Sequence, residues 1–126
     1  MAIRPTKYTI TVSATASTKT CYTTEILNGY VHAIRYVKST SGPLSSTADL
    51  DIQGSVSGIS VLTSLAVGSA SFTKYPRVAC VNSTNGALTW YDRIPISDEV
   101  LKLTVAKTTA GANNGTFYIY MDGSPM

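Results

Sequence analysis

His32 is the only histidine of the chain, and it lies in the apolar stretch Tyr30–Tyr36. A catalytic triad requires a nucleophile, a histidine base and a carboxylate that orients the base. Asp49 or Asp51 could supply that carboxylate, but the GxSxG turn that exposes a serine nucleophile is absent from the sequence. We therefore interpret His32 as a structural residue of a strand, and the sequence predicts no catalytic residues and no enzyme.

Two carboxylates, Asp49 and Asp51, alternate with apolar residues and so share one face of a predicted strand. Such a pair resembles half of a calcium site. A third acidic ligand is not found close by in the sequence, and the Asp-Gly turn of an EF-hand loop is missing. We interpret the pair as solvated surface charge and predict no metal and no other cofactor; whether these two residues bind a cation is left open.

The two cysteines, Cys21 and Cys80, do not form a CxxC pair, and two thiolates are too few for a usual zinc site. The first residues of the chain lack the apolar region of a secretory signal. We therefore expect free, buried thiols rather than a disulfide.

Aromatic side chains beside polar groups form a second kind of candidate site. Trp90 and Tyr91 are followed by Asp92, so the rings could stack on a sugar while the carboxylate accepts hydrogen bonds from its hydroxyls. Packing of Trp90 into the core at a strand end is the alternative that we favour.

The last predicted strand, 116–121, is aromatic on both faces because Tyr118 and Tyr120 alternate with apolar residues. In a single domain, one of these faces would be exposed to water. Tyrosine is common at protein–protein contacts. We therefore nominate Tyr118 and Tyr120, together with Trp90 and Tyr91, as the candidate interaction surface.

The composition bounds the elements that position these residues. The length fits one domain, 1–126, in which residues 1–6 form a candidate extended N-terminal arm. Hydrophobic residues make up 44% of the chain, enough for a core, whereas charged residues make up only 13%. The polar surface must therefore come largely from Ser and Thr, which suit strands and turns.

Short runs rich in Val, Ile, Thr and Tyr alternate with turn residues, a pattern typical of an antiparallel β-sandwich or jelly-roll. We predict about eight to nine strands, at 7–13, 19–27, 30–38, 48–53, 59–65, 77–82, 87–93, 100–107 and 116–121. The strand 30–38 is apolar on both faces and should be central.

Turn signals separate these runs. Asn28-Gly29 predicts a hairpin turn, and Asn85-Gly86 predicts a second one. The sequence also predicts a turn at residues 113–115 and a loop or an edge strand at residues 66–71. Pro95 excludes a central strand at its position.

The formal net charge is +3, and the basic residues are scattered along the chain without a run of five. The electrostatic pattern of a nucleic-acid-binding protein is therefore missing, although Tyr30–Tyr36 alternates aromatic and basic residues as a base-stacking strand would. No run of 18 apolar residues could cross a membrane as a helix. We expect no nucleic-acid partner, no membrane, and a chain that stays in the cytoplasm unless it leaves within a particle.

Four segments in the middle of the chain resemble small virion proteins of tailed bacteriophages. They are Gly29–Tyr36, Ala48–Ile52, Gly58–Leu62 and Lys74–Arg77, and the resemblance covers about residues 25 to 110. The shared pattern is a glycine-led strand ending in I-x-Y, an alternating strand, G-x-x-[apolar]-L and Y-P. It is made of strand and turn residues and assigns no functional residue.

The resemblance implies a β-sandwich with a structural role and no catalysis, most often in capsid decoration, head completion or tail assembly. A capsid decoration or cement protein would bind the major capsid protein or another virion structural protein. It would form a homo-oligomer, a trimer by analogy, and would reside in the virion after assembly in the host cytoplasm. An extended arm at residues 1–6 could add a strand to a neighbour's sheet.

Two other function classes compete with this hypothesis. A carbohydrate- or receptor-binding module of a fibre or tail would need Trp90, Tyr91 and Asp92 exposed in one shallow groove. A small enzyme would need His32 to share a cleft with an acid and a hydroxyl.

Overall fold

Strands make up the regular structure of this protein in the computed structural model, which describes residues 6–14, 18–64, 70–81, 87–106 and 113–122. The side chains of residues 14, 78–81 and 87–91 are not part of that description. The strands are β1 (Thr6–Ala14), β2 (Thr18–Tyr22), β3 (Leu27–Lys38), β4 (Asp49–Gly54), β5 (Ser60–Ser64), β6 (Phe72–Lys74), β7 (Val78–Val81), β8 (Ala87–Asp92), β9 (Ile94–Glu99), β10 (Leu101–Ala106) and β11 (Asn113–Asp122). Within the described ranges, no helix is long and apolar enough to span a membrane.

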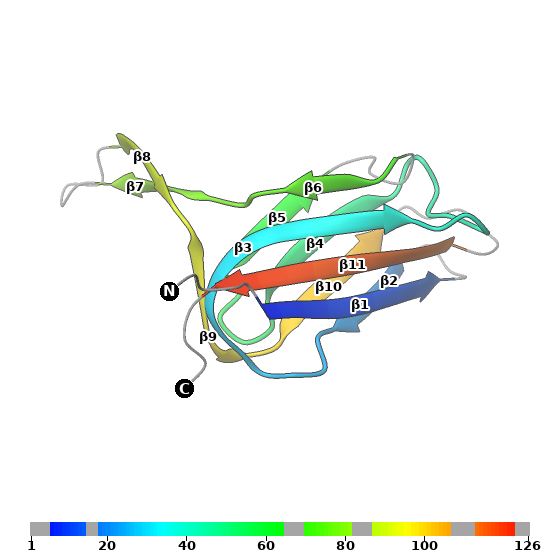
Figure 1. Ribbon diagram of the computed structural model, residues 1–126, viewed down its shortest axis with the longest axis horizontal. Coiled ribbons are helices and arrows are strands. Elements are labelled where there is room, and N and C mark those ends of the chain that lie inside the picture. The colour runs from blue at the N-terminus through cyan, green and yellow to red at the C-terminus, as the bar shows by residue number, and fades with distance from the viewer. Residues whose placement is uncertain (1–5, 15–17, 65–69, 82–86, 107–112, 123–126) are drawn as a thin grey trace.

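Two antiparallel sheets pack face to face (Figure 1). One has five strands, in the order β1-β11-β3, with β6 and β9 both paired to the remaining side of β3. The other has four strands, in the order β2-β10-β4-β5. The predicted antiparallel β-sandwich is thus confirmed, and β3 is central as expected, lying between β11 and the pair β6 and β9.

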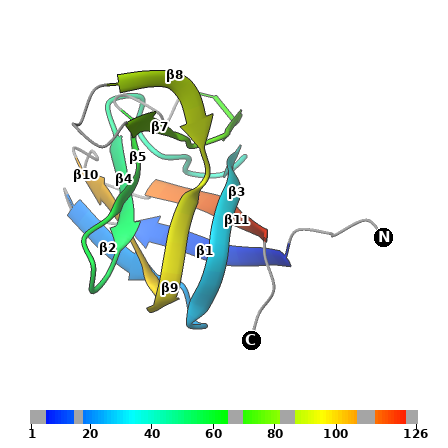
Figure 2. The ribbon, with the colours of Figure 1, turned by 90° about the vertical axis from the view of Figure 1, so that its left-hand side faces the viewer.

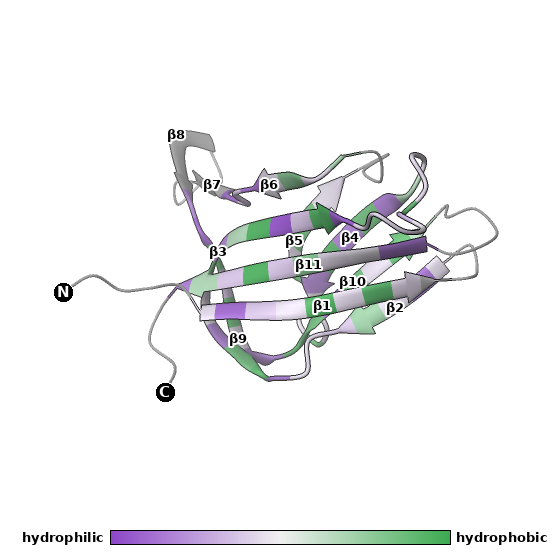
Figure 3. Cartoon of the chain, turned by 45° about the vertical axis from the view of Figure 1, so that its right-hand side comes forward, coloured by the Kyte–Doolittle hydropathy of each residue, from purple (hydrophilic) through white to green (hydrophobic). Residues whose placement is uncertain are grey.

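The core forms because strands of both sheets alternate apolar and polar residues (Figure 3). In β10, Leu101, Leu103 and Val105 are buried while the residues between them are partly exposed. From the opposite sheet, the ring of Tyr36 stacks on Phe117 with the ring centroids 5.0 Å apart. Each fully buried side chain of this size contributes about 1.5–3 kcal/mol, so burial between the two sheets is the main term that holds them together.

The hairpin predicted at Asn28-Gly29 is wrong. Both residues lie inside β3, where the register against β9 shifts between Leu27 and Gly29, a β-bulge. Gly29 has a φ of 122°, so its freedom from a Cβ serves the bulge rather than a turn. The strand predicted at 19–27 ends at Tyr22, because residues 23–26 carry the chain from the four-stranded sheet to the five-stranded sheet.

The turn predicted at 113–115 is also wrong, because these residues begin β11. Asn113 uses its side chain as a local anchor: its Oδ1 accepts a hydrogen bond of 3.1 Å from the backbone N–H of Ser45. Gly115 faces the ring of Tyr36, and a Cβ on it would lie 2.7 Å from Cε1 of that ring. The glycine is therefore required by close packing within a strand.

Two strands were not predicted, and both lie at the edge beside β3. β6 has only three residues, and β9 contains Pro95, which pairs with Tyr30. A proline has no backbone N–H to donate to a neighbouring strand and is therefore tolerated at a sheet edge. The prediction that Pro95 does not lie in a central strand agrees with this position. The predicted turn at Asn85-Gly86, most of the stretch 66–71 and residues 1–5 of the proposed arm lie outside the described residues, whereas Thr6 belongs to β1.

β7 and β8 pair with each other and form a two-stranded sheet of their own. Figure 1 shows this hairpin extending beyond the sandwich at one end, and Figure 2 shows β8 curving into β9. Its two strands correspond to the predictions at 77–82 and 87–93. The hairpin is thus an appendage of the five-stranded sheet.

Candidate interaction surface

Tyr118 and Tyr120 lie on the outer face of the five-stranded sheet. They alternate along β11 with Phe117, Ile119 and Met121, which are buried in the core. The period of two of a strand thus forces the tyrosines outward. Both are partly exposed, so one face of this strand is wet, as the sequence indicated.

The register places basic residues on both sides of this tyrosine pair. Tyr118 pairs with Arg35 of β3, and Tyr120 pairs with Lys7 of β1. The Nζ of Lys7 lies 4.9 Å from the ring centroid of Tyr118, within the range of a cation–π contact. Lys7 and Arg35, which are far apart in the sequence, therefore flank the two tyrosines from the strands on either side of β11.

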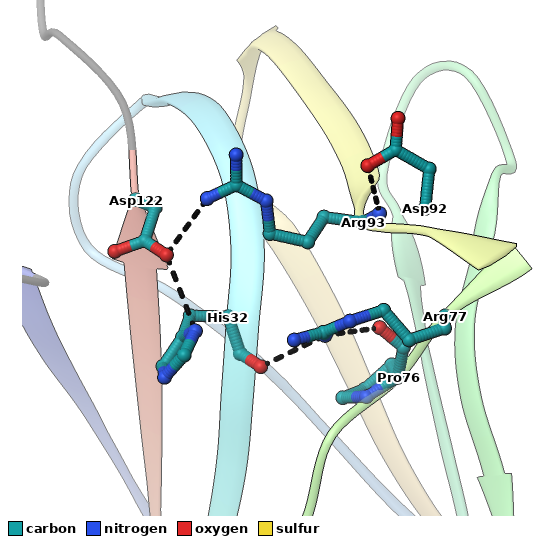
Figure 4. A network of polar contacts seen from close by, with 6 residues as sticks. All are labelled: His32, Pro76, Arg77, Asp92, Arg93 and Asp122. Carbon is teal, nitrogen blue, oxygen red and sulfur yellow. Dashed lines mark hydrogen bonds and ion pairs between the residues drawn. The ribbon is translucent and has the colours of Figure 1, made fainter.

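A polar cluster continues this face at the end of β11. The Oδ2 of Asp122 accepts a hydrogen bond of 2.8 Å from Nη1 of Arg93 and lies 3.2 Å from Nδ1 of His32 (Figure 4). The guanidinium of Arg93 also lies over the ring of Tyr30, with Cζ 4.9 Å from the ring centroid. One carboxylate thus joins side chains from β3, β11 and the segment between β8 and β9.

The backbone of His32 holds the chain that leads to β7. Nη1 of Arg77 donates hydrogen bonds to the carbonyl oxygens of His32, at 3.0 Å, and of Pro76, at 2.7 Å (Figure 4). The ring of Tyr75 meets the imidazole of His32 edge-on, with 5.9 Å between centroids. These contacts fasten both ends of the β7–β8 hairpin to the same corner of the sandwich.

The chemistry at this corner is that of an anchor. The acid beside His32 is Asp122, whereas Asp49 and Asp51 belong to the other sheet. Within the described part of the chain, no hydroxyl or thiol is hydrogen-bonded to the imidazole. The contacts of His32 among the described residues are thus the carboxylate of Asp122 and the ring of Tyr75, and its structural role stays a prediction.

Asp51, one of the two acidic residues of β4, is hydrogen-bonded to the neighbouring strand. Oδ1 of Asp51 accepts a hydrogen bond of 3.1 Å from Oγ1 of Thr63 on the neighbouring strand β5. No group of three or more histidine, cysteine or acidic side chains is placed to hold a metal in the described ranges.

Trp90 and Tyr91 are only partly covered by the structure. Their backbone lies in β8 of the projecting hairpin, and their side chains are outside the described part of the chain. Asp92, the third member of the proposed sugar site, is exposed, and its Oδ1 accepts a hydrogen bond of 2.7 Å from the N–H of Arg93. The groove proposed for these three residues therefore stays a prediction.

A shallow hollow of about 400 Å³ lies at the other end of the outer face. It is lined mainly by hydroxyl, amide and small side chains, among them Thr11, Ser13, Val37, Asn114 and Thr116. Lys38 also lines this hollow, so the outer face changes along the strands from an aromatic, charged end at Asp122 to a mainly polar end at Asn114 with one basic residue.

Sequence reasoning missed Lys7, Arg35, Arg93 and Asp122 as neighbours of the tyrosines. Each lies at an outward position of its strand or at a strand end, and the alternation of polar and apolar residues predicts these positions. The missing information was the order β1-β11-β3, which depends on pairings between residues more than 80 positions apart, such as Lys7 with Tyr120.

No protein-family model matches the chain, and no curated protein matches it. Among solved structures, a crystal structure of FLHE aligns with 95% of this chain and 99% of its own, at 8% sequence identity and a TM-score of 0.46. At that identity and TM-score, the likeness does not bear on family or function.

Proposed function

We propose that this protein is a structural component of an assembled particle and binds a neighbouring protein subunit through the outer face of its five-stranded sheet. The observation that carries the proposal is the row formed by Tyr118 and Tyr120 with Lys7 and Arg35 beside it. Aromatic residues and arginine are enriched in protein interfaces, and a sheet presents them without loss of backbone freedom.

The more specific form of this proposal is a capsid decoration or cement protein of a tailed phage that binds the major capsid protein. It rests on the resemblance of the segments between residues 25 and 110. A decoration protein must hold a subunit seam by buried area, about 1,000 Å² or more for stable attachment. The outer face of β1, β11 and β3, which are adjacent strands of nine, ten and twelve residues, is the surface that we expect to supply this area.

The test combines location and attachment. Particles purified from lysates of the source cells are examined by cryo-electron microscopy, where we expect density for this sandwich with Tyr118 and Tyr120 against a neighbouring subunit. Particles stripped of the chain are then incubated with purified variants. Tyr118→Ser combined with Tyr120→Ser should weaken attachment about ten-fold or more, whereas Tyr22→Ser, an exposed tyrosine of the other sheet, should bind normally.

Two results would overturn the proposal: absence of the chain from every particle fraction, or normal attachment of the double tyrosine variant. Density at a neck or tail would retain the structural role but remove the capsid decoration role.

We also propose a second candidate function, binding of a glycan or receptor by the β7–β8 hairpin. The projection of this hairpin beyond the sandwich favours it, because β8 carries Trp90 and Tyr91 away from the two main sheets (Figure 1). A glycan array probed with the labelled protein tests this function. Binding that Trp90→Ala abolishes and Tyr22→Ser preserves would support it, and an array without any bound glycan would exclude it for the glycans tested.

A further inference from the structure

The first strand forms a long, straight sheet edge. β1 has nine residues, Thr6–Ala14, and among the described residues it pairs only with β11. Its pairing with β11 runs without a register shift over its whole length. Because alternate residues of a strand direct N–H and C=O groups to opposite sides, β1 presents a row of backbone donors and acceptors away from β11, about 30 Å long.

The other edges of the two sheets carry features that discourage pairing with a further strand. On the far side of the same sheet, β9 has Pro95 and a register shift, and β6 has three residues. In the other sheet, β5 has five residues and a register shift against β4, and β2 also has five residues. Proline, bulges and short strands are the usual protection of edges.

β1 lacks this protection. It contains no proline, no glycine and no bulge, and Lys7 is its only charged residue. Edge strands of this kind accept a further strand by backbone hydrogen bonding. The contrast with the protected edge strands β5, β6 and β9, and with the shorter β2, indicates that β1 has a partner in the functional protein.

We propose that this partner is β1 of a second copy of the chain, paired antiparallel about a two-fold axis at Ile10. Residues opposite each other in an antiparallel ladder have side chains on the same face. A strand that pairs with itself must therefore place one residue opposite its own copy, and Ile10 is the residue that lets all nine positions overlap. Ile10 is 3% exposed and points into the core, so the two cores meet at the axis.

The pairs made by this register are favourable. On the outer face, Thr9 lies opposite Thr11 of the second copy on both sides of the axis, and Thr–Thr pairs across strands are stabilising. Lys7 lies opposite Ser13, and the two copies of Lys7 are six positions apart along the ladder, about 20 Å. On the inner face, Tyr8 meets Val12. The register thus pairs polar with polar and apolar with apolar side chains, and it keeps the two copies of Lys7 apart.

The pairing doubles the candidate interaction surface. It joins two five-stranded sheets into one, with Tyr118 and Tyr120 of each copy on the strand next to the shared β1 ladder. The result is a two-fold dimer, which differs from the trimer expected by analogy with decoration proteins. The inference does not depend on the proposed function, because it concerns the backbone edge of β1 and not the outer face that carries Tyr118 and Tyr120.

A charge exchange on the outer face of β1 tests the inference. Thr9 and Thr11 are exposed, so substitution there leaves the core intact. One variant carries Thr9→Lys with Thr11→Lys, and a second carries Thr9→Glu with Thr11→Glu. In each variant alone, like charges face each other in two pairs, and we expect the dissociation constant of the dimer to rise about ten-fold or more. Mixing the two variants should restore a dimer that contains one of each, detected by native mass spectrometry.

In analytical ultracentrifugation, the fraction of the wild-type chain that sediments as a dimer should rise as the concentration is increased to about 100 µM. The matched control carries Thr73→Glu with Ser97→Glu, two exposed positions at the opposite edge of the same sheet; it should remain dimeric. Circular dichroism reports whether each variant is folded. A wild-type monomer across this range, or dimers unaffected by like charges on β1, would overturn the inference, whatever the outcome of the particle-binding experiment.

Discussion

The carboxylate of Glu99 accepts a hydrogen bond of 3.0 Å from the backbone N–H of Ser57, and this contact joins the two sheets. Glu99 ends β9 of one sheet, and Ser57 lies in the tight turn between β4 and β5 of the other. The same oxygen, Oε1, accepts a second bond of 2.9 Å from the N–H of Val56. Glu99 is 5% exposed, so this buried carboxylate, rather than water, accepts the hydrogen bonds of the turn.

Hydrogen bonds from the backbone and the hydroxyl of Ser57, and from the backbone of Val56, lower the pKa of Glu99 in the folded protein. The folded state therefore binds fewer protons than the unfolded state, and Glu99 contributes stability above its unfolded pKa that is lost as the pH falls through the folded pKa. We expect Glu99→Gln to reduce the free energy of unfolding at pH 7 by about 1–3 kcal/mol. Urea unfolding measured at pH values from about 7 down to 3 checks this.

The pH dependence distinguishes this effect from general destabilisation. The difference in unfolding free energy between wild type and Glu99→Gln should shrink as the pH is lowered. Glu25→Gln is the matched control, because Glu25 is an exposed carboxyl of the neighbouring loop. A constant difference between wild type and Glu99→Gln at every pH would contradict the role of the ionised carboxylate.

Gly115→Ala should destabilise the fold although the residue lies in a strand, where alanine is normally tolerated. The added Cβ would lie 2.7 Å from Cε1 of Tyr36, whose ring is fully buried and stacked on Phe117. Forcing that ring to move costs about 1–3 kcal/mol. Thermal unfolding followed by circular dichroism measures the loss, with Thr116→Ala, at a partly exposed neighbouring position, as the control. Equal stability of Gly115→Ala and wild type would show that the ring can move aside freely.

The alternation of apolar residues was sufficient to predict most strands of the sandwich, although it missed β6 and β9. In 100–107, the inward set Leu101, Leu103 and Val105 is fully buried in the structure. Glycine and asparagine were less informative, because Asn28-Gly29 and Asn114-Gly115 serve a bulge and a close contact instead of turns. At each position the local sequence is compatible with a turn and with a place inside a strand. The neighbour in the folded protein, β9 for Gly29 and the Tyr36 ring for Gly115, decides between these two structures.

The candidate surface was predictable in part. Tyr118 and Tyr120 followed from their period of two, since their inward neighbours needed burial. The polar cluster could not be predicted, because Asp122, Arg93 and His32 come from segments whose contact depends on the pairing of β3 with both β9 and β11. Trp90 and Tyr91 were expected on the same surface, and the structure places their strand on the projecting hairpin.

Asp122→Ala should loosen the β7–β8 hairpin without unfolding the sandwich. It removes the acceptor that Arg93 and His32 share. Because these side chains are partly exposed, the loss in unfolding free energy should stay within about 1 kcal/mol. The sensitive measurement is hydrogen exchange, which should accelerate at the amides of residues 92–96. Asp51→Ala, which removes a similar surface hydrogen bond on the other sheet, should leave those amides unchanged; unchanged exchange in Asp122→Ala as well would show that Asp122 is not the anchor.

Cys21 should react slowly with alkylating reagents in the folded protein. Its thiol is free and half-buried against the core, and desolvation raises its pKa, while the charge of Lys19 partly opposes that rise. The thiolate is the reactive form, so alkylation by iodoacetamide at pH 8, measured in a Cys80→Ser background, should be several-fold slower than in urea. Lys19→Ala should slow it further because it removes the opposing charge, whereas Lys7→Ala should not. Reaction of the folded chain as fast as the unfolded chain would mean that β2 opens readily, and would place this edge among the least stable parts of the sandwich.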